Sequence, residues 1–178
     1  MNVSAGELLA RYGPPHRGRE PRVIATGRPG FRLRFYPGVR DDARALLKRF
    51  ARWIRDQVPF RHPVRVTVVP HATVMGHEEP PGWAVFVIPP PEYSPGDVVR
   101  IYLGAGKVDV LERDFGISSP DSILRLMHDL AHEIVHYEQW RDGREVTERG
   151  VNSRAAAWVN RFCREVLRYD GPALEWPP

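Results

Sequence analysis

The stretch that decides the fold is His132-Glu133-Ile134-Val135-His136. One helical turn separates the two histidines, so a helix would present both imidazoles on one face, as two ligands of a tetrahedral zinc ion require. The carboxylate of Glu133 stands beside them, where it could accept a proton from a water molecule. Because five residues of this kind also occur together by chance, the surrounding sequence decides how they are interpreted.

A helix is predicted around these residues, from Ser119 to about Trp140. Ser119 and Pro120 are typical of an N-cap followed by proline at the first helical position, and Gly143 marks the end. The apolar residues form one stripe, which comprises Ile123, Leu126, Met127, Leu130 and Ile134. The histidines and Glu133 lie on the opposite, polar side with Arg125, His128, Asp129 and Gln139. That side either lines a cleft or faces solvent.

A third zinc ligand has to come from another segment. No histidine follows His136, and the single cysteine, Cys163, excludes a cysteine-based zinc cluster. The sequence predicts a last helix from Thr147 to about Tyr169, with Glu148 projecting from the middle of its apolar stripe. An acid in a core-facing stripe is unfavourable unless a cation neutralises it, so we interpret Glu148 as the third ligand. The alternatives are that Glu148 reaches solvent, or that Glu145 binds the metal.

Two further residues are candidates for supporting the ligands. A histidine that binds a metal normally donates its second ring N–H to an oxygen atom. Asn152 lies one turn beyond Glu148 and could supply this oxygen, and Asp129 is a second candidate. An ordinary surface or interhelical hydrogen bond is the alternative for both.

Alternating and continuous apolar runs before the motif predict a small sheet. We expect strands at residues 31–35, 64–68, 83–88 and 98–103, and a short one at residues 73–75 is possible. The proline-rich link before residue 98 suggests that strand 98–103 is a sheet edge. A short helix is expected around Leu8 and Leu9, and a longer one from Asp41 to near Val58. The predicted fold class is therefore α+β.

Composition limits the class of protein. The chain has 178 residues, of which 42% are hydrophobic, as expected for one domain with a real core. No segment approaches the roughly 18 apolar residues of a membrane span, and the start lacks a secretory signal, so we expect a cytoplasmic protein. The net charge is +4, and residues 11–40 carry eight arginines. A solvated basic face is favoured there over a nucleic-acid surface.

At His132, Glu133, His136 and Glu148 the chain resembles the gluzincin metallopeptidases, which bind zinc through two histidines of one helix and a glutamate of the next. The small size and the strand order are similar to minimal zincin-like scaffolds and to SprT-like proteins. The resemblance implies a zincin-like domain at residues 41–178, preceded by an N-terminal extension at residues 1–40 that forms one compact unit with it. SprT-like DNA-associated proteases use a third histidine, which this chain lacks, so their DNA-linked role is not carried over.

The resemblance also implies a zinc-dependent hydrolase acting on peptide or protein substrates. Glu133 would be the general base for a zinc-activated water, and strand 98–103 would pair with an extended substrate. A donor to the developing oxyanion is not assigned; the candidates are Tyr93, Tyr102, His77, His71 and Tyr169. One alternative is a catalytically silent zinc-binding domain that acts as a sensor or as a protein or nucleic-acid interaction module. The other is a binding module in which the motif is fortuitous.

Overall fold

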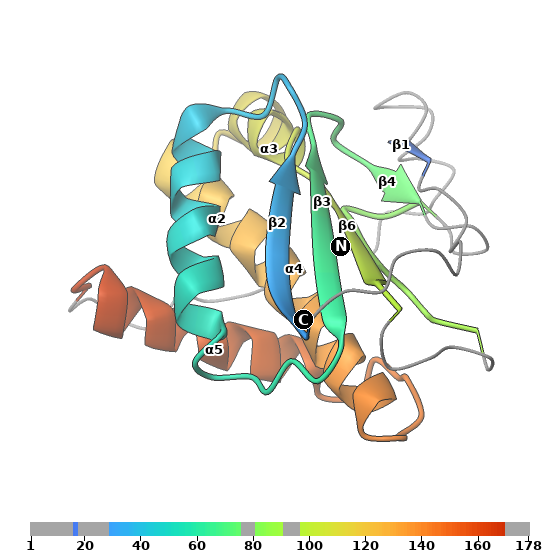
Figure 1. The fold of residues 1–178 in the computed structure, drawn as a ribbon. Coiled ribbons are helices and arrows are strands. Elements are labelled where there is room, and N and C mark those ends of the chain that lie inside the picture. Colours follow the sequence, from blue (N-terminus) through green and yellow to red (C-terminus); the bar gives the residue numbers. More distant parts are fainter. Residues whose placement is uncertain (1–15, 18–28, 76–80, 91–96, 170–178) are drawn as a thin grey trace.

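The computed structural model describes residues 16–17, 29–75, 81–90 and 97–169. Within these ranges the chain is α+β, with four helices and a small mixed sheet of four strands (Figure 1). The helices are α2 (Asp41–Ile54), α3 (Lys107–Phe115), α4 (Ser119–Arg141) and α5 (Val151–Val166). The predicted α+β class is confirmed, whereas the helix expected around Leu8 and Leu9 lies outside the described residues.

The four-stranded sheet has the order β2-β3-β6-β5. Its strands are β2 (Gly30–Phe35), β3 (Pro63–Val69), β6 (Val99–Gly104) and β5 (Ala84–Val87). The first three are parallel, and β5 runs antiparallel to β6. The prediction that strand 98–103 is an edge is therefore wrong. The proline-rich link excludes a tight hairpin, but a longer connection still lets β5 pair on the outer side of β6.

The N-terminal segment is part of this sheet. β2 falls within the predicted extension and pairs with β3 over six residues, from Gly30 with Pro63 to Phe35 with Val68. A second pairing joins β1 (His16–Arg17) to β4 (Val74–Met75). Strand β2 of the predicted extension therefore belongs to the same sheet as strands that follow residue 40.

Helix α3 was not predicted. Five of its nine residues are charged and its N-cap is Gly106. The segment therefore has neither a capping side chain nor a long apolar stripe, the two sequence patterns that predict a helix. Its C-cap, Gly116, has a φ of 64°, a conformation that glycine adopts without strain. α3 buries Val108, Val110 and Leu111 and packs against α4.

Helix α4 lies at the centre of the main core. Its N-cap is Ser118, one residue before the predicted position, and the Ser118 hydroxyl oxygen accepts a hydrogen bond from the Asp121 N–H. Leu126, Leu130 and Ile134 are fully buried, and they belong to a core shared with α2, α5 and one face of the sheet. Each such side chain stabilises the fold by about 1.5–3 kcal/mol. The apolar stripe therefore fixes how α4 is rotated, and with it the direction of the polar side.

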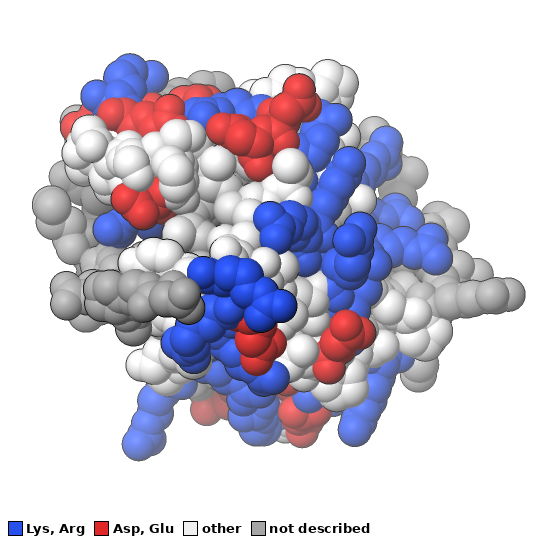
Figure 2. Space-filling view, turned by 90° about the vertical axis from the view of Figure 1, so that its left-hand side faces the viewer, with Lys and Arg blue, Asp and Glu red and all other residues white. Residues whose placement is uncertain are grey.

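Basic side chains gather at the centre and right of the face shown in Figure 2, on the side of the molecule where α2 lies, with acidic groups among them. Lys48 and Arg52 of α2 and Arg32 and Arg34 of β2 are exposed. Arg40 is engaged instead, because it forms ion pairs with Asp42, Asp109 and Glu112. β2 and β5 are the two outer strands of the sheet, so this basic surface and β5 lie at opposite edges.

Candidate metal centre

A cavity of about 540 Å³ lies between α4, β5 and the loop of residues 142–150, which joins α4 to α5. It is lined by Pro81, Gly82, Ala84, Val85, Phe86, Ile88, His132, Glu133, His136, Val146, Thr147 and Glu148. His136 is 6% exposed and Glu133 is 8% exposed. The part of the polar side of α4 that carries His132, Glu133 and His136 therefore lines a cleft, as one of the two expectations held, and does not simply face solvent.

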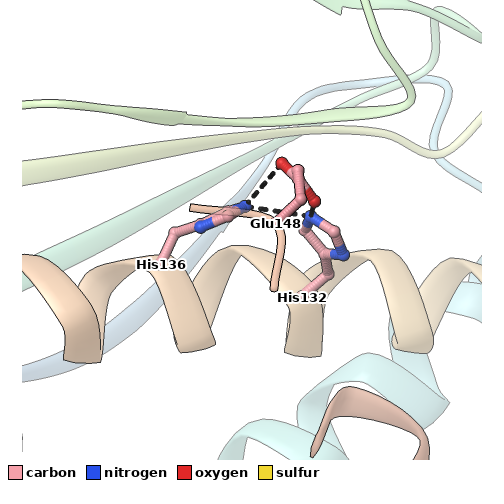
Figure 3. Close-up of side chains that lie close together, drawn as sticks. All are labelled: His132, His136 and Glu148. Carbon is pink, nitrogen blue, oxygen red and sulfur yellow. Dashed lines mark hydrogen bonds and ion pairs between the residues drawn. The ribbon is translucent and has the colours of Figure 1, made fainter. Parts of the chain in front are cut away.

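Three side chains converge at this cavity, two from α4 and one from loop 142–150 (Figure 3). The Nε2 atoms of His132 and His136 are 3.0 Å apart. Each lies 3.2 Å from a carboxylate oxygen of Glu148. In a tetrahedral zinc site with bonds of 2.0–2.1 Å, neighbouring ligand atoms are about 3.3–3.4 Å apart. The N–N and N–O contacts are close to this spacing, and the two imidazoles contact different oxygens of the Glu148 carboxylate.

Hydrogen bonds fix which ring nitrogen faces the cavity. The Nδ1 of His132 lies 2.9 Å from Asn152 Oδ1, and the Nδ1 of His136 lies 3.1 Å from Gln139 Oε1. Amide oxygens only accept hydrogen bonds, so both Nδ1 atoms carry a hydrogen, and a neutral ring then presents its lone pair on Nε2. Burial lowers the pKa of His132 below its usual 6.5, which keeps that ring neutral at pH 7. Two facing lone pairs and a carboxylate repel one another unless a cation lies between them.

Glu148 reaches this position from a place that the sequence did not predict. Helix α5 begins at Val151, because Gly150, with a φ of 75°, separates it from the preceding residues. Glu148 lies in the loop before the helix, and its side chain is 75% exposed. The expectation that it projects from an apolar helix stripe is wrong, although the carboxylate does lie beside both histidines. Glu145 does not line the cavity.

Glu133 is anchored to the edge of the sheet. Its Oε2 accepts a hydrogen bond of 2.7 Å from the backbone N–H of Phe86 in β5. The residue is buried, yet its carboxylate lines the same cavity as the two imidazoles. This contact fixes both the side chain of Glu133 and the distance between α4 and β5.

The two candidate supporting residues have different roles. Asn152 does contact a histidine of the cluster, as the bond to His132 shows. Asp129 does not: its Oδ2 accepts a hydrogen bond of 2.6 Å from Lys107 Nζ. Lys107 belongs to the unpredicted helix α3, so the ion pair of Asp129 could not be predicted from the sequence.

None of the described oxyanion candidates lines the cavity. Tyr102 packs with Val69, Val74, Val85 and Val87 in a separate apolar cluster, whereas its strand neighbours Ile101 and Leu103 belong to the main core. His71 lies in the turn after β3, and Tyr169 follows the end of α5. His77 and Tyr93 lie outside the described residues. Gln139, by contrast, was predicted only as part of the polar side, although its position three residues after His136 could have indicated the contact.

The chain matches no protein-family model, no curated protein and no solved structure. Among the described helices, none is both long and apolar enough to cross a membrane.

Proposed function

We propose that this protein is a zinc-dependent peptidase with a zincin-like fold and a gluzincin-type ligand set. The observation that carries the proposal is the convergence of His132, His136 and Glu148, with both imidazole Nδ1 atoms held by amide oxygens. Two neutral imidazoles and one carboxylate are a donor set that zinc prefers. Three protein ligands leave the fourth position to water or substrate, which is typical of a catalytic site.

Glu133 supplies the proton chemistry in this proposal. When bound, zinc lowers the pKa of a water molecule and polarises a carbonyl group. The Glu133 carboxylate would accept a proton from the attacking water and pass it to the leaving amine. The hydrogen bond from the Phe86 N–H holds the carboxylate at the cavity, so this general base is in place before a substrate arrives. A purely structural zinc site would not need a carboxylate there.

Strand β5 offers the edge on which an extended substrate would bind. Trp83 O accepts a hydrogen bond from Gly104 N, which places the backbone groups of Trp83 on the β6 side. Successive residues alternate along a strand, so Ala84 and Phe86 direct their backbone groups to the outer side, and the Phe86 contact with Glu133 agrees with this. A peptide that adds to this edge would bond to the outward groups of Ala84 and to the Phe86 carbonyl, because the Phe86 N–H is already bonded to Glu133. β5 thus takes the place first expected for strand 98–103.

A second candidate is the catalytically silent domain, which binds zinc and serves as a sensor or interaction module. Two observations favour it: none of the described oxyanion candidates lines the cavity, and the basic surface over α2 lies at the opposite edge of the sheet. That surface would contact an anionic partner, such as nucleic acid, without involving the cavity. In this case zinc would bind and no peptide would be cleaved.

Metal analysis followed by a cleavage assay tests both candidates. The chain, purified without added metal, is expected to contain or take up one zinc ion, and to cleave an unfolded protein or a peptide library. A chelator should stop cleavage, and zinc should restore it. Zinc uptake without cleavage supports the silent domain. A chain that neither contains nor takes up zinc refutes both candidates.

A further inference from the structure

The side chain of Gln139 contacts two parts of the cluster at once. Its Oε1 accepts hydrogen bonds from His136 Nδ1, at 3.1 Å, and from the backbone N–H of Thr147, at 3.1 Å. Its Nε2 donates to the backbone carbonyl of Thr147, at 3.0 Å. Gln139 is 7% exposed, and Thr147 immediately precedes Glu148. One amide group therefore joins a histidine of the cluster to the segment that carries the carboxylate.

Loop 142–150 has few other attachments near Glu148. Gly143 and Gly150 flank it with φ values of 66° and 75°, and neither has a neighbouring atom within 4 Å of the position of a Cβ. The backbone bond from Arg144 N to Gln139 O, at 2.8 Å, holds the start of the loop, and the bond from Val151 N to Glu148 O, at 3.2 Å, joins its end to α5. In the described part of the chain, Gln139 provides the only side-chain hydrogen bonds to Thr147. Between these two ends, the side chain of Gln139 holds the residue that precedes Glu148.

We propose that Gln139 is a positioning residue that couples the third ligand to His136. This inference rests on the proposed zinc site. An unheld loop would have to be ordered when the metal binds, at a cost in conformational entropy; the contact to Gln139 orders it beforehand. The same oxygen keeps the hydrogen of His136 on Nδ1, so the lone pair of Nε2 and the carboxylate of Glu148 are presented together. Partners of this kind typically contribute about 10–100-fold to metal affinity.

The chemistry requires an amide at position 139. Thr147 presents both an N–H and a carbonyl, so its partner must accept and donate at once. A leucine does neither. A glutamate retains the acceptor for His136 and Thr147 N–H, but it places a second oxygen against the Thr147 carbonyl, which is repulsive. Gln139→Glu therefore separates support of His136 from support of the loop.

Hydrogen exchange of the Thr147 amide in the metal-free protein tests the contact without any metal. In the wild type this amide should be protected, and Gln139→Leu should speed its exchange about tenfold, the effect of losing a bond worth about 1.4 kcal/mol. Asn152→Ala is the matched control, because Asn152 supports His132 and does not contact Thr147. Equal exchange at Thr147 in the wild type and in Gln139→Leu overturns the proposal.

Zinc affinity, measured by competition with a chromophoric chelator, tests the coupling. Gln139→Leu should weaken zinc binding about 10–100-fold, and Gln139→Glu should also weaken it. In a Glu148→Ala background the effect of Gln139→Leu should shrink, because the loop then carries no ligand, whereas Asn152→Ala should have the same effect in both backgrounds. A full effect of Gln139→Leu without Glu148 shows that only His136 is supported, and overturns the proposal.

Two outcomes distinguish this inference from the proposed function. If the wild type binds zinc and Gln139→Leu binds it equally well, the coupling is refuted and the zinc site stands. If the wild type binds no zinc, the proposed function fails, and the coupling to a metal fails with it. Thermal unfolding of the metal-free variants checks the fold. If Gln139→Leu does not fold, the zinc affinity of Gln139→Glu decides, because that change removes only the bond donated to the Thr147 carbonyl; an affinity equal to that of the wild type then refutes the coupling.

Discussion

The candidate metal centre is built from two unlike regions, helix α4 and loop 142–150. α4 is a 23-residue helix in the middle of the core, and it presents His132, Glu133 and His136 from its buried polar side. The loop presents Glu148, whose side chain is 75% exposed, against 8% for that of His136. Packing fixes the first region, whereas hydrogen bonds to Gln139 hold the second. In the proposed zinc site, the helix sets the position of the metal and the loop contributes to the affinity.

The largest effect is expected on the helix side, from Glu133→Gln. The amide still accepts the hydrogen bond from Phe86 N–H but cannot take a proton from water. Peptide cleavage should fall by about 10²–10⁴-fold, the usual contribution of a general base, while zinc content stays unchanged. Turnover numbers together with metal analysis of both proteins check this. Equal turnover would exclude Glu133 as the base.

On the loop side, Glu148→Ala should weaken zinc binding by more than the roughly 100-fold upper range for supporting residues. The reason is that it removes the carboxylate whose two oxygens lie 3.2 Å from the Nε2 atoms of His132 and His136. Glu145→Ala, in the same loop, is the control and should leave affinity unchanged. Zinc competition titrations compare the two. The opposite result would move the third ligand to Glu145.

The free energy of unfolding should depend on helix α4 far more than on loop 142–150. Ile134→Ala removes a fully buried side chain from the core face of α4 and should lower the free energy of unfolding by about 2–5 kcal/mol. Glu145→Ala in the exposed loop should change it by less than about 0.5 kcal/mol. Urea unfolding of the metal-free proteins measures both. Comparable losses would mean that the loop belongs to the core.

The smallest effect concerns acid. Burial lowers the pKa of His62 and of His128 below 6.5. As the pH falls below 6.5, the unfolded chain takes up protons that the folded chain does not, so stability decreases by at most about 1.4 kcal/mol per pH unit for each histidine. Above pH 6.5 both rings are mostly neutral in the folded and in the unfolded chain, so this loss of stability occurs only on acidification. The free energy of unfolding, measured by urea denaturation at each pH from 7.5 to 5, should depend less on pH in the double variant His62→Gln/His128→Gln. An unchanged pH dependence would contradict this.

The contrast also explains what the sequence could predict. The stripe through Leu126, Leu130 and Ile134 determined both the helix and the direction of its histidines, because periodic burial leaves a direct pattern in a sequence. Glu148 was predicted as a ligand because it was placed in the last helix. It lies outside that helix, because Gly150, with a positive φ, precedes the start of α5 at Val151. The contacts of Gln139 with Thr147 form because loop 142–150 folds back toward α4. No short-range sequence pattern predicts that path of the loop.

The position of β5 was missed for a similar reason, because pairing between distant strands depends on the whole sheet. Alternation and apolar runs identified residues 83–88 and 98–103 as strands, and both are present. Which of them lies outermost depends on the parallel pairing of β6 with β3, a contact across more than thirty residues of sequence. Local patterns specify strands, and tertiary contacts specify their order.

The shortness of β5 has a consequence for how separate molecules meet. An open strand edge invites the same edge of a second copy to pair with it, which leads to self-association. Here the strand has four residues, and it is enclosed by Pro81 on one side and by Pro89 and Pro90 on the other. Proline has no N–H to extend a ladder. The short edge between these prolines therefore offers few backbone groups for pairing with a second copy of the chain.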